Sequence, residues 1–185
     1  GEANSVAIRI ARASTSKHKV AFCGYHGWHD WYLSSNLSRD KKLGFHLFPG
    51  VQIKGVPRQL KKTSIPFFYG DLKELKRIIK KEKIGIIKME VARFEKPNIH
   101  FLRNVRKLCD KNNIILIFDE CTTGFRENYG GLHKTIGVNP DIAIFGKTLG
   151  NGYAINAIIG KKKFMSNVTS TFISSTFWGE RIGYV

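Results

Sequence analysis

Short apolar runs alternate with amphipathic stretches along the chain, and this alternation predicts an α/β fold. Apolar residues recur at helical spacing over residues 2–13, after the good N-cap Asp71, and around Phe101 and Leu108. The run 114–118 is apolar on both faces, as is typical of a buried parallel strand. Shorter runs predict the other strands at residues 19–23, 84–87, 142–145 and 157–159. The order of these elements predicts a mainly parallel sheet with right-handed crossovers and helices on both faces.

The stretch from residue 28 to residue 66 breaks the alternation. It carries Gly, Pro and Ser without a sustained period, which predicts a long loop with one or two helical turns. Further on, Asp141 follows Pro140, and this pair predicts a turn. The sequence holds no internal repeat, low-complexity tract or linker. We therefore expect residues 1–185 to form one domain with no internal boundary.

Length and composition bound the class of protein. The 185 residues are 42% hydrophobic and 24% charged, which is enough to bury a core. The longest apolar run, 114–118, is far below the ~18 residues of a membrane span, so we expect none. Residues 1–5 hold neither an initiator Met nor a signal-peptide pattern, and we expect a chain cut from a longer one. Three scattered cysteines without a Cys-x-x-Cys pair predict a reducing, cytoplasmic compartment: Cys23, Cys109 and Cys121.

The net charge is strongly positive. Lys and Arg number 31 against 14 Asp and Glu, which gives +17 and raises the question of nucleic acid or anionic lipid. The basic residues are spread over predicted helical faces and loops, as at 61–62, 80–81 and 161–163, and no nucleic-acid-binding motif surrounds them. We expect a lysine-rich solvated surface and no specific nucleic-acid partner.

Three groups of polar residues directly follow predicted strands. Asp119 and Glu120 come after the most hydrophobic strand, and Lys147 follows 142–145. Tyr25, with His26 and Gly27 behind it, follows 19–23. Open α/β sheets hold their ligands at the carboxyl ends of the strands. A carboxylate at Asp119 is costly to bury unless a cation or a strong donor pairs with it.

One alternative for these residues is a nucleotide-hydrolysing site. Residues 115–120 resemble a Walker B strand, and 146–148 resemble the end of a P-loop. However, Asp141 stands where the P-loop needs its first glycine, and residues 143–145 are predicted as a strand. The phosphate loop would also follow the Walker B strand instead of preceding it. We therefore do not favour this alternative.

A second alternative is a metal site formed by Cys23, His26 and His29. Their spacing is tolerable, but the sequence offers no evident fourth ligand, and the intervening Tyr25 and Trp28 suit stacking better. We predict no metal.

Pyridoxal phosphate chemistry fits the same residues better, because it needs a specific set of groups. A lysine amine must form a Schiff base with the cofactor aldehyde, and a carboxylate must keep the pyridine nitrogen protonated so that the ring withdraws electrons. An aromatic face should cover the ring, and a glycine-rich helix N-terminus should take the phosphate. Lys147, Asp119, Tyr25 and the helix start at Gly1 supply one of each.

Motifs along the whole chain resemble class III aminotransferases, in that family's order and spacing. The branch that contains glutamate-1-semialdehyde aminomutase matches best, since Gly-Phe-Arg after the Asp-Glu pair is usual there. The motifs are Gly-Glu-Ala-Asn at 1–4, Tyr-His-Gly-Trp at 25–28, Phe-Asp-Glu at 118–120, Thr-Gly-Phe-Arg at 123–126, Pro-Asp at 140–141, Gly-Lys at 146–147 and Gly-Asn-Gly-Tyr at 150–153.

The resemblance implies roles for three residues of the reaction centre. Lys147 matches the Schiff-base lysine, which after release acts as the base that moves a proton at the substrate α-carbon. Asp119 matches the carboxylate on the pyridine nitrogen. Tyr25 matches the aromatic residue stacked on the ring.

It also implies roles around the cofactor. Gly1 falls in the phosphate-binding turn, and Thr176 matches a threonine that reaches the phosphate across a dimer interface. Thr122 stands near the cofactor phenolic oxygen, where relatives often have Gln or Met. Glu95 matches a Glu or Asn close to the cofactor, and Glu90 matches a glutamate that ends the preceding strand.

On this resemblance the chain is an incomplete large domain of a fold type I enzyme, from a homodimer with shared active sites. The implied reaction transfers an amino group from a small amino donor to a carbonyl acceptor by a ping-pong route. An intramolecular aminomutase reaction stays open. So does a non-catalytic alternative, a truncated basic binding protein of the same fold, and we expect the fragment alone to be inactive.

Overall fold

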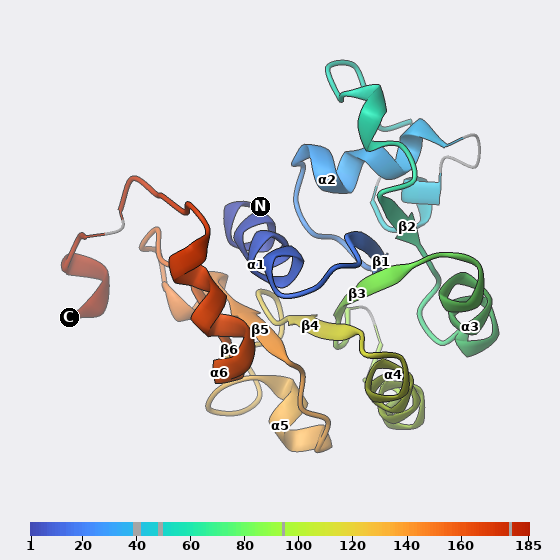
Figure 1. Ribbon diagram of the computed structural model, residues 1–185. Coiled ribbons are helices and arrows are strands. Elements are labelled where there is room, and N and C mark those ends of the chain that lie inside the picture. Colours follow the sequence, from blue (N-terminus) through green and yellow to red (C-terminus); the bar gives the residue numbers. More distant parts are fainter. Residues whose placement is uncertain (39–41, 48–49, 94, 178) are drawn as a thin grey trace.

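A computed structural model of the protein describes residues 1–38, 42–47, 50–93, 95–177 and 179–185 (Figure 1). Its centre is a six-stranded sheet with the order β2-β1-β3-β4-β5-β6. Strands β5 and β6 are antiparallel, and all other neighbouring pairs are parallel, which confirms the predicted mainly parallel sheet. The strands are β1 (Lys19–Cys23), β2 (Ser64–Pro66), β3 (Ile84–Glu90), β4 (Ile115–Asp119), β5 (Ile142–Phe145) and β6 (Ala157–Gly160).

Helices cover both faces of the sheet, as predicted (Figure 1). One face packs against α3 (Leu72–Lys81), α4 (Ile99–Asn112) and α5 (Leu132–Ile136). The other face packs against α1 (Glu2–Ala13), α2 (Asp30–Leu33) and α6 (Lys162–Met165). Every residue of β3, β4 and β5 is buried, which explains why these strands carry apolar side chains toward both layers.

Helices α3 and α4 each begin at a residue whose side chain caps the first turn. Asp71 accepts a hydrogen bond from the Glu74 N–H at 2.7 Å, which confirms it as the N-cap of α3. Asn98 caps α4 in the same way, through the Phe101 N–H at 2.9 Å. None of the helices in the described ranges is both long and apolar enough to cross a membrane.

The prediction of a long loop over residues 28–66 was wrong in part. The described residues there form α2, strand β2, and three short 3-10 helices at Ser34–Leu37, Lys42–Phe45 and Arg58–Leu60. Strand β2 has three residues, too few to show a period of two, and it forms only because β1 pairs with it. Strand β3 also runs past the predicted residue 87, since buried Lys88 and Glu90 interrupt its apolar pattern.

Glu120 explains the unpredicted helix α5. Its buried carboxylate accepts hydrogen bonds from the Leu132 N–H at 3.1 Å and the His133 N–H at 2.8 Å. These are N–H groups of the first turn, which have no partner within the helix. A five-residue helix is therefore anchored by a carboxylate from a distant strand end.

Asp141 is more than the turn residue that Pro140 predicts. It is buried and accepts hydrogen bonds from the Leu116 N–H at 2.9 Å, the Arg106 guanidinium at 3.0 Å and Lys161 Nζ at 2.7 Å. Burial by itself favours the protonated acid, but these donors and cations together lower the pKa of Asp141. The carboxylate thus ties α4, β4 and the segment after β6 together at the amino end of β5.

Candidate active site

Lys147 lies just past the carboxyl end of β5, at the start of a 3-10 helix (Lys147–Leu149). Its φ of +48° is in the left-handed region, which costs a non-glycine residue about 1–2 kcal/mol. Its Nζ donates a hydrogen bond to Thr122 Oγ1 at 3.0 Å. Thr122 follows β4, the strand beside β5, so the two predicted site residues meet at one edge of the sheet.

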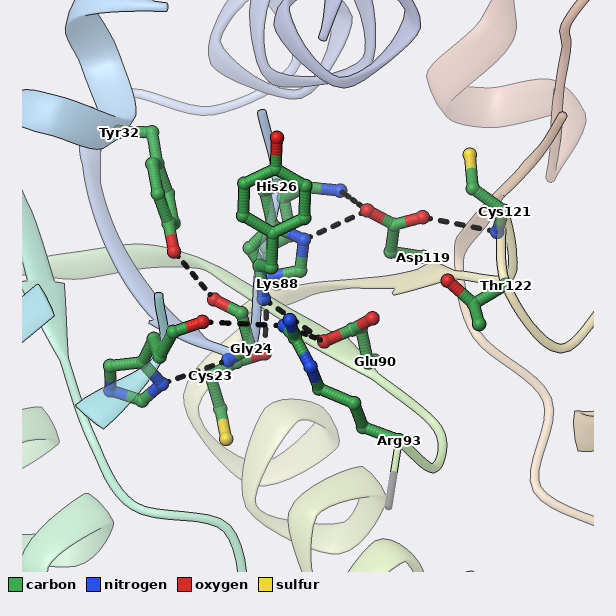
Figure 2. A network of polar contacts seen from close by, with 12 residues as sticks. Cys23, Gly24, His26, Tyr32, Lys88, Glu90, Arg93, Asp119, Cys121 and Thr122 are labelled. Atoms are coloured by element: carbon green, nitrogen blue, oxygen red, sulfur yellow. Dashed lines mark hydrogen bonds and ion pairs between the residues drawn. The ribbon is translucent and has the colours of Figure 1, made fainter. Parts of the chain in front are cut away.

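Asp119 is the last residue of β4 and is 3% exposed. Figure 2 shows His26 and Lys88 approaching one carboxylate oxygen, and the Cys121 backbone approaching the other. His26 Nδ1 lies 2.8 Å from Oδ2, Lys88 Nζ lies 3.7 Å from the same oxygen, and the Cys121 N–H donates to Oδ1 at 3.1 Å. Oδ1 therefore keeps an acceptor position beyond the one that Cys121 fills.

The surroundings of Asp119 keep it ionised. Burial alone would raise its pKa, but the charge of Lys88 and the hydrogen bond from His26 outweigh burial and lower the pKa well below its usual range. Cys121 behaves differently, since burial and then Asp119 raise its thiol pKa to about 12. The site thus holds a permanent carboxylate and a protonated thiol at neutral pH.

Tyr25 follows β1, and its position is set by Gly24 and Glu90. Gly24 has a φ of +106°, which strains any residue with a side chain, and a Cβ there would overlap the Glu90 carboxylate. The Tyr25 N–H donates to Glu90 Oε2 at 2.9 Å. Glu90 lies opposite Asp119 in the β3–β4 register, which places the Tyr25 backbone beside the Asp119 strand end.

Tyr25 is 36% exposed, so it can take part in stacking. The Arg93 guanidinium lies 5.5 Å from the ring centroid, a cation–π distance, and Tyr32 contacts the ring edge-on. Arg93 also donates to Glu90 at 3.1 Å. The ring is thus supported by Arg93 and Tyr32 while part of its surface stays open.

Gly1 lies at the amino end of α1, against the loop that carries Tyr25. A Cβ on Gly27, whose φ is +96°, would stand 2.7 Å from Gly1 Cα. The two backbones can approach so closely because both residues lack a side chain. The amino end of a twelve-residue helix is therefore held next to the Tyr25 loop, where its free N–H groups favour an anion.

A hollow of about 370 Å³ is lined in part by Gly24 and Glu90. Phe45, Phe68 and Tyr69 supply its apolar wall, and Glu90, Arg93 and Glu95 supply charge. Glu95, which the resemblance assigns to the vicinity of the cofactor, thus lies in this hollow. A cavity of this size suits a small molecule.

Thr176 is not brought to this site within one chain. It is exposed in a turn of the C-terminal segment, which extends away from the sheet (Figure 1). Within the described ranges, no hydrogen bond connects Thr176 to Lys147, Asp119 or Tyr25.

The geometry also bears on the two alternatives weighed from the sequence. His26 directs one ring nitrogen at Asp119 and the other at the Cys23 carbonyl oxygen, 3.0 Å away, whereas His29 Nδ1 contacts Ser5 Oγ at 2.8 Å. Within the described part of the chain, no group of three or more His, Cys, Asp or Glu residues could hold a metal ion. Residues 143–145 lie in β5, which leaves no loop there to wrap a phosphate.

Two residues of the site were not assigned a role in it from the sequence, His26 and Lys88. Lys88 is completely buried in the middle of β3, where it pairs in register with Phe22 and Ile117. The only signal is a lysine inside an otherwise apolar run, which marks a buried cation but does not name its partner. His26 is buried and contacts Asp119; it lies in the Tyr-His-Gly-Trp motif at 25–28, but that motif does not reveal Asp119 as its partner.

The profile of the family described as "Aminotransferase class-III" matches residues 1–184. The chain belongs to this family. Among curated class III relatives, it is 38% identical over 194 residues to the 3-aminobutyryl-CoA aminotransferase of Cloacimonas acidaminovorans, which it matches over 100% of its own length and 42% of the relative's. It is 36% identical to the glutamate-1-semialdehyde 2,1-aminomutase of Nitrosopumilus maritimus, over 98% of this chain and 44% of that one. The chain thus spans less than half the length of these curated class III relatives.

Solved structures of transaminases support the fold. An omega-transaminase from Sphaerobacter thermophilus superposes with a TM-score of 0.77 at 26% identity, over 95% of this chain and 43% of that one. A structure titled "Transaminase with PLP bound" gives a TM-score of 0.79 at 23% identity, with the same coverage. The class III chain described here therefore has the α/β fold of part of a transaminase, as the sequence predicts.

Proposed function

We propose that the protein containing this chain transfers an amino group between small molecules, with pyridoxal phosphate held by Lys147 and Asp119. The observation that carries the proposal is that Lys147 Nζ, through Thr122, and the ionised Asp119 lie at the carboxyl ends of neighbouring strands. Membership of the class III aminotransferase family supports it. A small amino donor and a carbonyl acceptor would take turns at the site.

The residues present fit this cofactor. Asp119 stays ionised with an acceptor position on Oδ1 for a protonated ring nitrogen, and the open ring of Tyr25 suits stacking on a pyridine. The amino end of α1 at Gly1 suits a phosphate group. When bound, pyridoxal phosphate supplies an aldehyde for covalent attachment and an electron-withdrawing ring.

Lys147 has two tasks in this proposal. Its amine would be the attachment point for the cofactor, and once free Nζ would take a proton from the substrate α-carbon and deliver it to C4′ of the cofactor. Thr122 holds Nζ in place, because its Oγ1 accepts a hydrogen bond from the amine. Since Nζ is the donor, the Thr122 hydroxyl proton stays available for a cofactor oxygen.

Thr176 and the assembly complete the proposal. We infer a homodimer in which Thr176 of one chain reaches the phosphate held at Gly1 of the other. Its exposure, in a segment that leaves the body of its own chain, supports this arrangement. We also propose that residues 1–185 belong to one large domain, that the protein acts in the cytoplasm, and that no nucleic acid or membrane is a specific partner.

An aminomutase is the second candidate, and it is favoured by the similarity to glutamate-1-semialdehyde 2,1-aminomutases. Such an enzyme moves the amine within one substrate. The two candidates differ in a simple assay, since a transaminase consumes more than one equivalent of amino donor per site only when a separate carbonyl acceptor is present, whereas an aminomutase turns over with a single substrate.

The test is chemical labelling of the complete gene product that carries this sequence. Incubation with pyridoxal phosphate should produce a visible absorbance band, and borohydride should fix a pyridoxyl group on the peptide that contains Lys147. Lys147→Ala should abolish both and lower turnover about 10²–10⁴-fold or more. Lys107→Ala, an exposed lysine of α4, is the matched control and should retain both. A wild-type protein that stays colourless with excess cofactor and is labelled nowhere would overturn the proposal.

A further inference from the structure

A basic groove of about 410 Å³ lies beside strand β2, at one edge of the sheet. It is lined by residues of α3, on one face of the sheet, and of the 3-10 helix Ser34–Leu37, which follows α2 on the other. Strands β1, β3 and β4 separate β2 from β5, the strand that Lys147 follows. The groove beside β2 is therefore separate from the candidate active site.

Four exposed basic side chains from two parts of the chain meet in this groove: Lys61, Lys62, Arg77 and Lys81. Among the described residues of its lining, Glu82 is the only carboxylate, and its Oε2 is already paired with Lys19 Nζ at 2.5 Å. The Arg77 guanidinium lies 3.9 Å from Glu74, a long and exposed contact. The groove therefore carries an excess of positive charge, which favours an anion.

Lys62 stands at a position where the backbone favours glycine. The Thr63 N–H donates to the Leu60 carbonyl oxygen at 3.1 Å, Lys61 has a φ of −54° and a ψ of 133°, and Lys62 has a φ of +63°. These values fit a type II turn, in which the residue with positive φ is usually glycine or asparagine. The turn itself does not explain a lysine at this position. Its ammonium group, which the turn places in the groove, offers an explanation.

Ser64 adds a polar group without a partner to the floor of the groove. The residue is 2% exposed, and its Oγ makes no hydrogen bond within the described ranges. Ser64 pairs in register with Val20, so its side chain lies on the same face of the sheet as Val20, the face of Ser35 and Ser38 in the groove. A buried hydroxyl is normally hydrogen-bonded. A ligand oxygen bound between the lysines would supply the missing partner.

We propose that the groove beside β2 is a second binding site, which takes a phosphate-bearing small molecule. A phosphate group carries close to two negative charges and several acceptor oxygens, which match the clustered ammonium and guanidinium donors. Ile65, Pro66 and Ile78 line the same groove and suit the carbon part of such a molecule. A volume of about 410 Å³ is the size of a small-molecule site and too small for a macromolecule.

The test is isothermal titration calorimetry of the complete gene product with inorganic pyrophosphate, at fixed ionic strength. The protein is first incubated with pyridoxal phosphate, so that an anion position at the amino end of α1 is filled. The wild type should bind one pyrophosphate per chain. Lys62→Gly should weaken binding about tenfold or more, because a charge-assisted hydrogen bond is lost. Since glycine suits the positive φ at this position, the variant should melt no lower than the wild type.

Ser64→Ala tests the buried hydroxyl, and should weaken pyrophosphate binding about threefold or more without lowering the melting temperature. Lys76→Met is the matched control, since Lys76 is exposed on α3 but lies outside the groove, and its affinity should equal that of the wild type. A wild type that binds no pyrophosphate, or an unchanged affinity of either groove variant, would overturn the proposal. So would an equal loss in Lys76→Met, which indicates unspecific attraction, or duplex DNA that displaces pyrophosphate from the groove. A protein that takes up no cofactor would reject the proposed function alone, because the Lys62 comparison still locates the bound pyrophosphate.

Discussion

Replacing Asp119 by asparagine should reveal how strongly the buried charges of the site depend on one another. Asp119→Asn keeps the shape of the side chain and its acceptor oxygen for the Cys121 N–H, but it removes the negative charge beside Lys88. Breaking a buried ion pair on one side costs about 3–5 kcal/mol, because an uncompensated charge stays behind. We expect a loss of this size, since Lys88 is fully buried and its only ion pair in the described structure is lost.

The assay is urea unfolding of the complete, cofactor-free gene product at pH 7. Because the folded-state pKa of Asp119 is depressed, its stabilisation is fully present above the ordinary value of about 3.9 and is lost only as the pH falls below it. Unchanged m-values should accompany the loss, which shows that the same surface unfolds. Asp110→Asn is the control, since that carboxylate is 64% exposed and its pair with Arg106 should contribute at most about 1 kcal/mol.

The double variant Asp119→Asn/Lys88→Met decides the interpretation. It removes both charges together, so it should be more stable than the sum of the single losses predicts, by about 1–3 kcal/mol. Two results would refute the reasoning: a loss below about 1 kcal/mol for Asp119→Asn, or losses that add within about 0.5 kcal/mol.

Two further predictions concern the supports of the site. Gly27→Ala places a Cβ 2.7 Å from Gly1 Cα at a φ of +96°, so it should displace the amino end of α1 and weaken pyridoxal phosphate binding about tenfold or more in an absorbance titration of the complete protein. Gly70→Ala is the control, because its φ of +87° imposes similar backbone strain while nothing lies within 4 Å of its Cβ. Equal affinities of the two variants for pyridoxal phosphate would count against the role of α1. Asp141→Ala should lower the free energy of unfolding by about 3–5 kcal/mol, since the half-buried Arg106 guanidinium and the buried Leu116 N–H lose their acceptor. Lys161→Met, at 47% side-chain exposure, should cost at most about 1 kcal/mol. Urea unfolding measures both, and a reversed order would contradict the assignment of Asp141 as the central group.

The sequence predicts this fold well where a signal is local. The runs at 114–118 and 142–145 identify neighbouring buried strands, and the polar residues behind them are Asp119 and Lys147. The strands are predicted from their apolar runs alone, and the polar residues are predicted from the rule that ligands bind at the carboxyl ends of parallel strands. Asp71 likewise announces α3, because an N-cap acts on its own helix.

Features that depend on distant partners could not be predicted in this way. Helix α5 is capped by Glu120, twelve residues before it, and β2 is a strand only because β1 lies beside it. The lysine at position 88 indicates a buried cation, but its partner Asp119 can be identified only once the register of β3 and β4 is known. The hydrogen bond between Lys147 and Thr122 likewise forms with a left-handed backbone at Lys147, a conformation that a lysine in the sequence does not predict.

The buried pair of Lys88 and Asp119 also has a consequence for how the sheet assembles. Side chains alternate between the faces of a strand, so a slip of one residue between β3 and β4 would turn one of the two charges toward the opposite layer. The neighbouring side chains on these strands are mostly interchangeable aliphatic groups and would tolerate such a slip far better. The two charges therefore favour the one register of β3 and β4 in which they lie on the same face of the sheet.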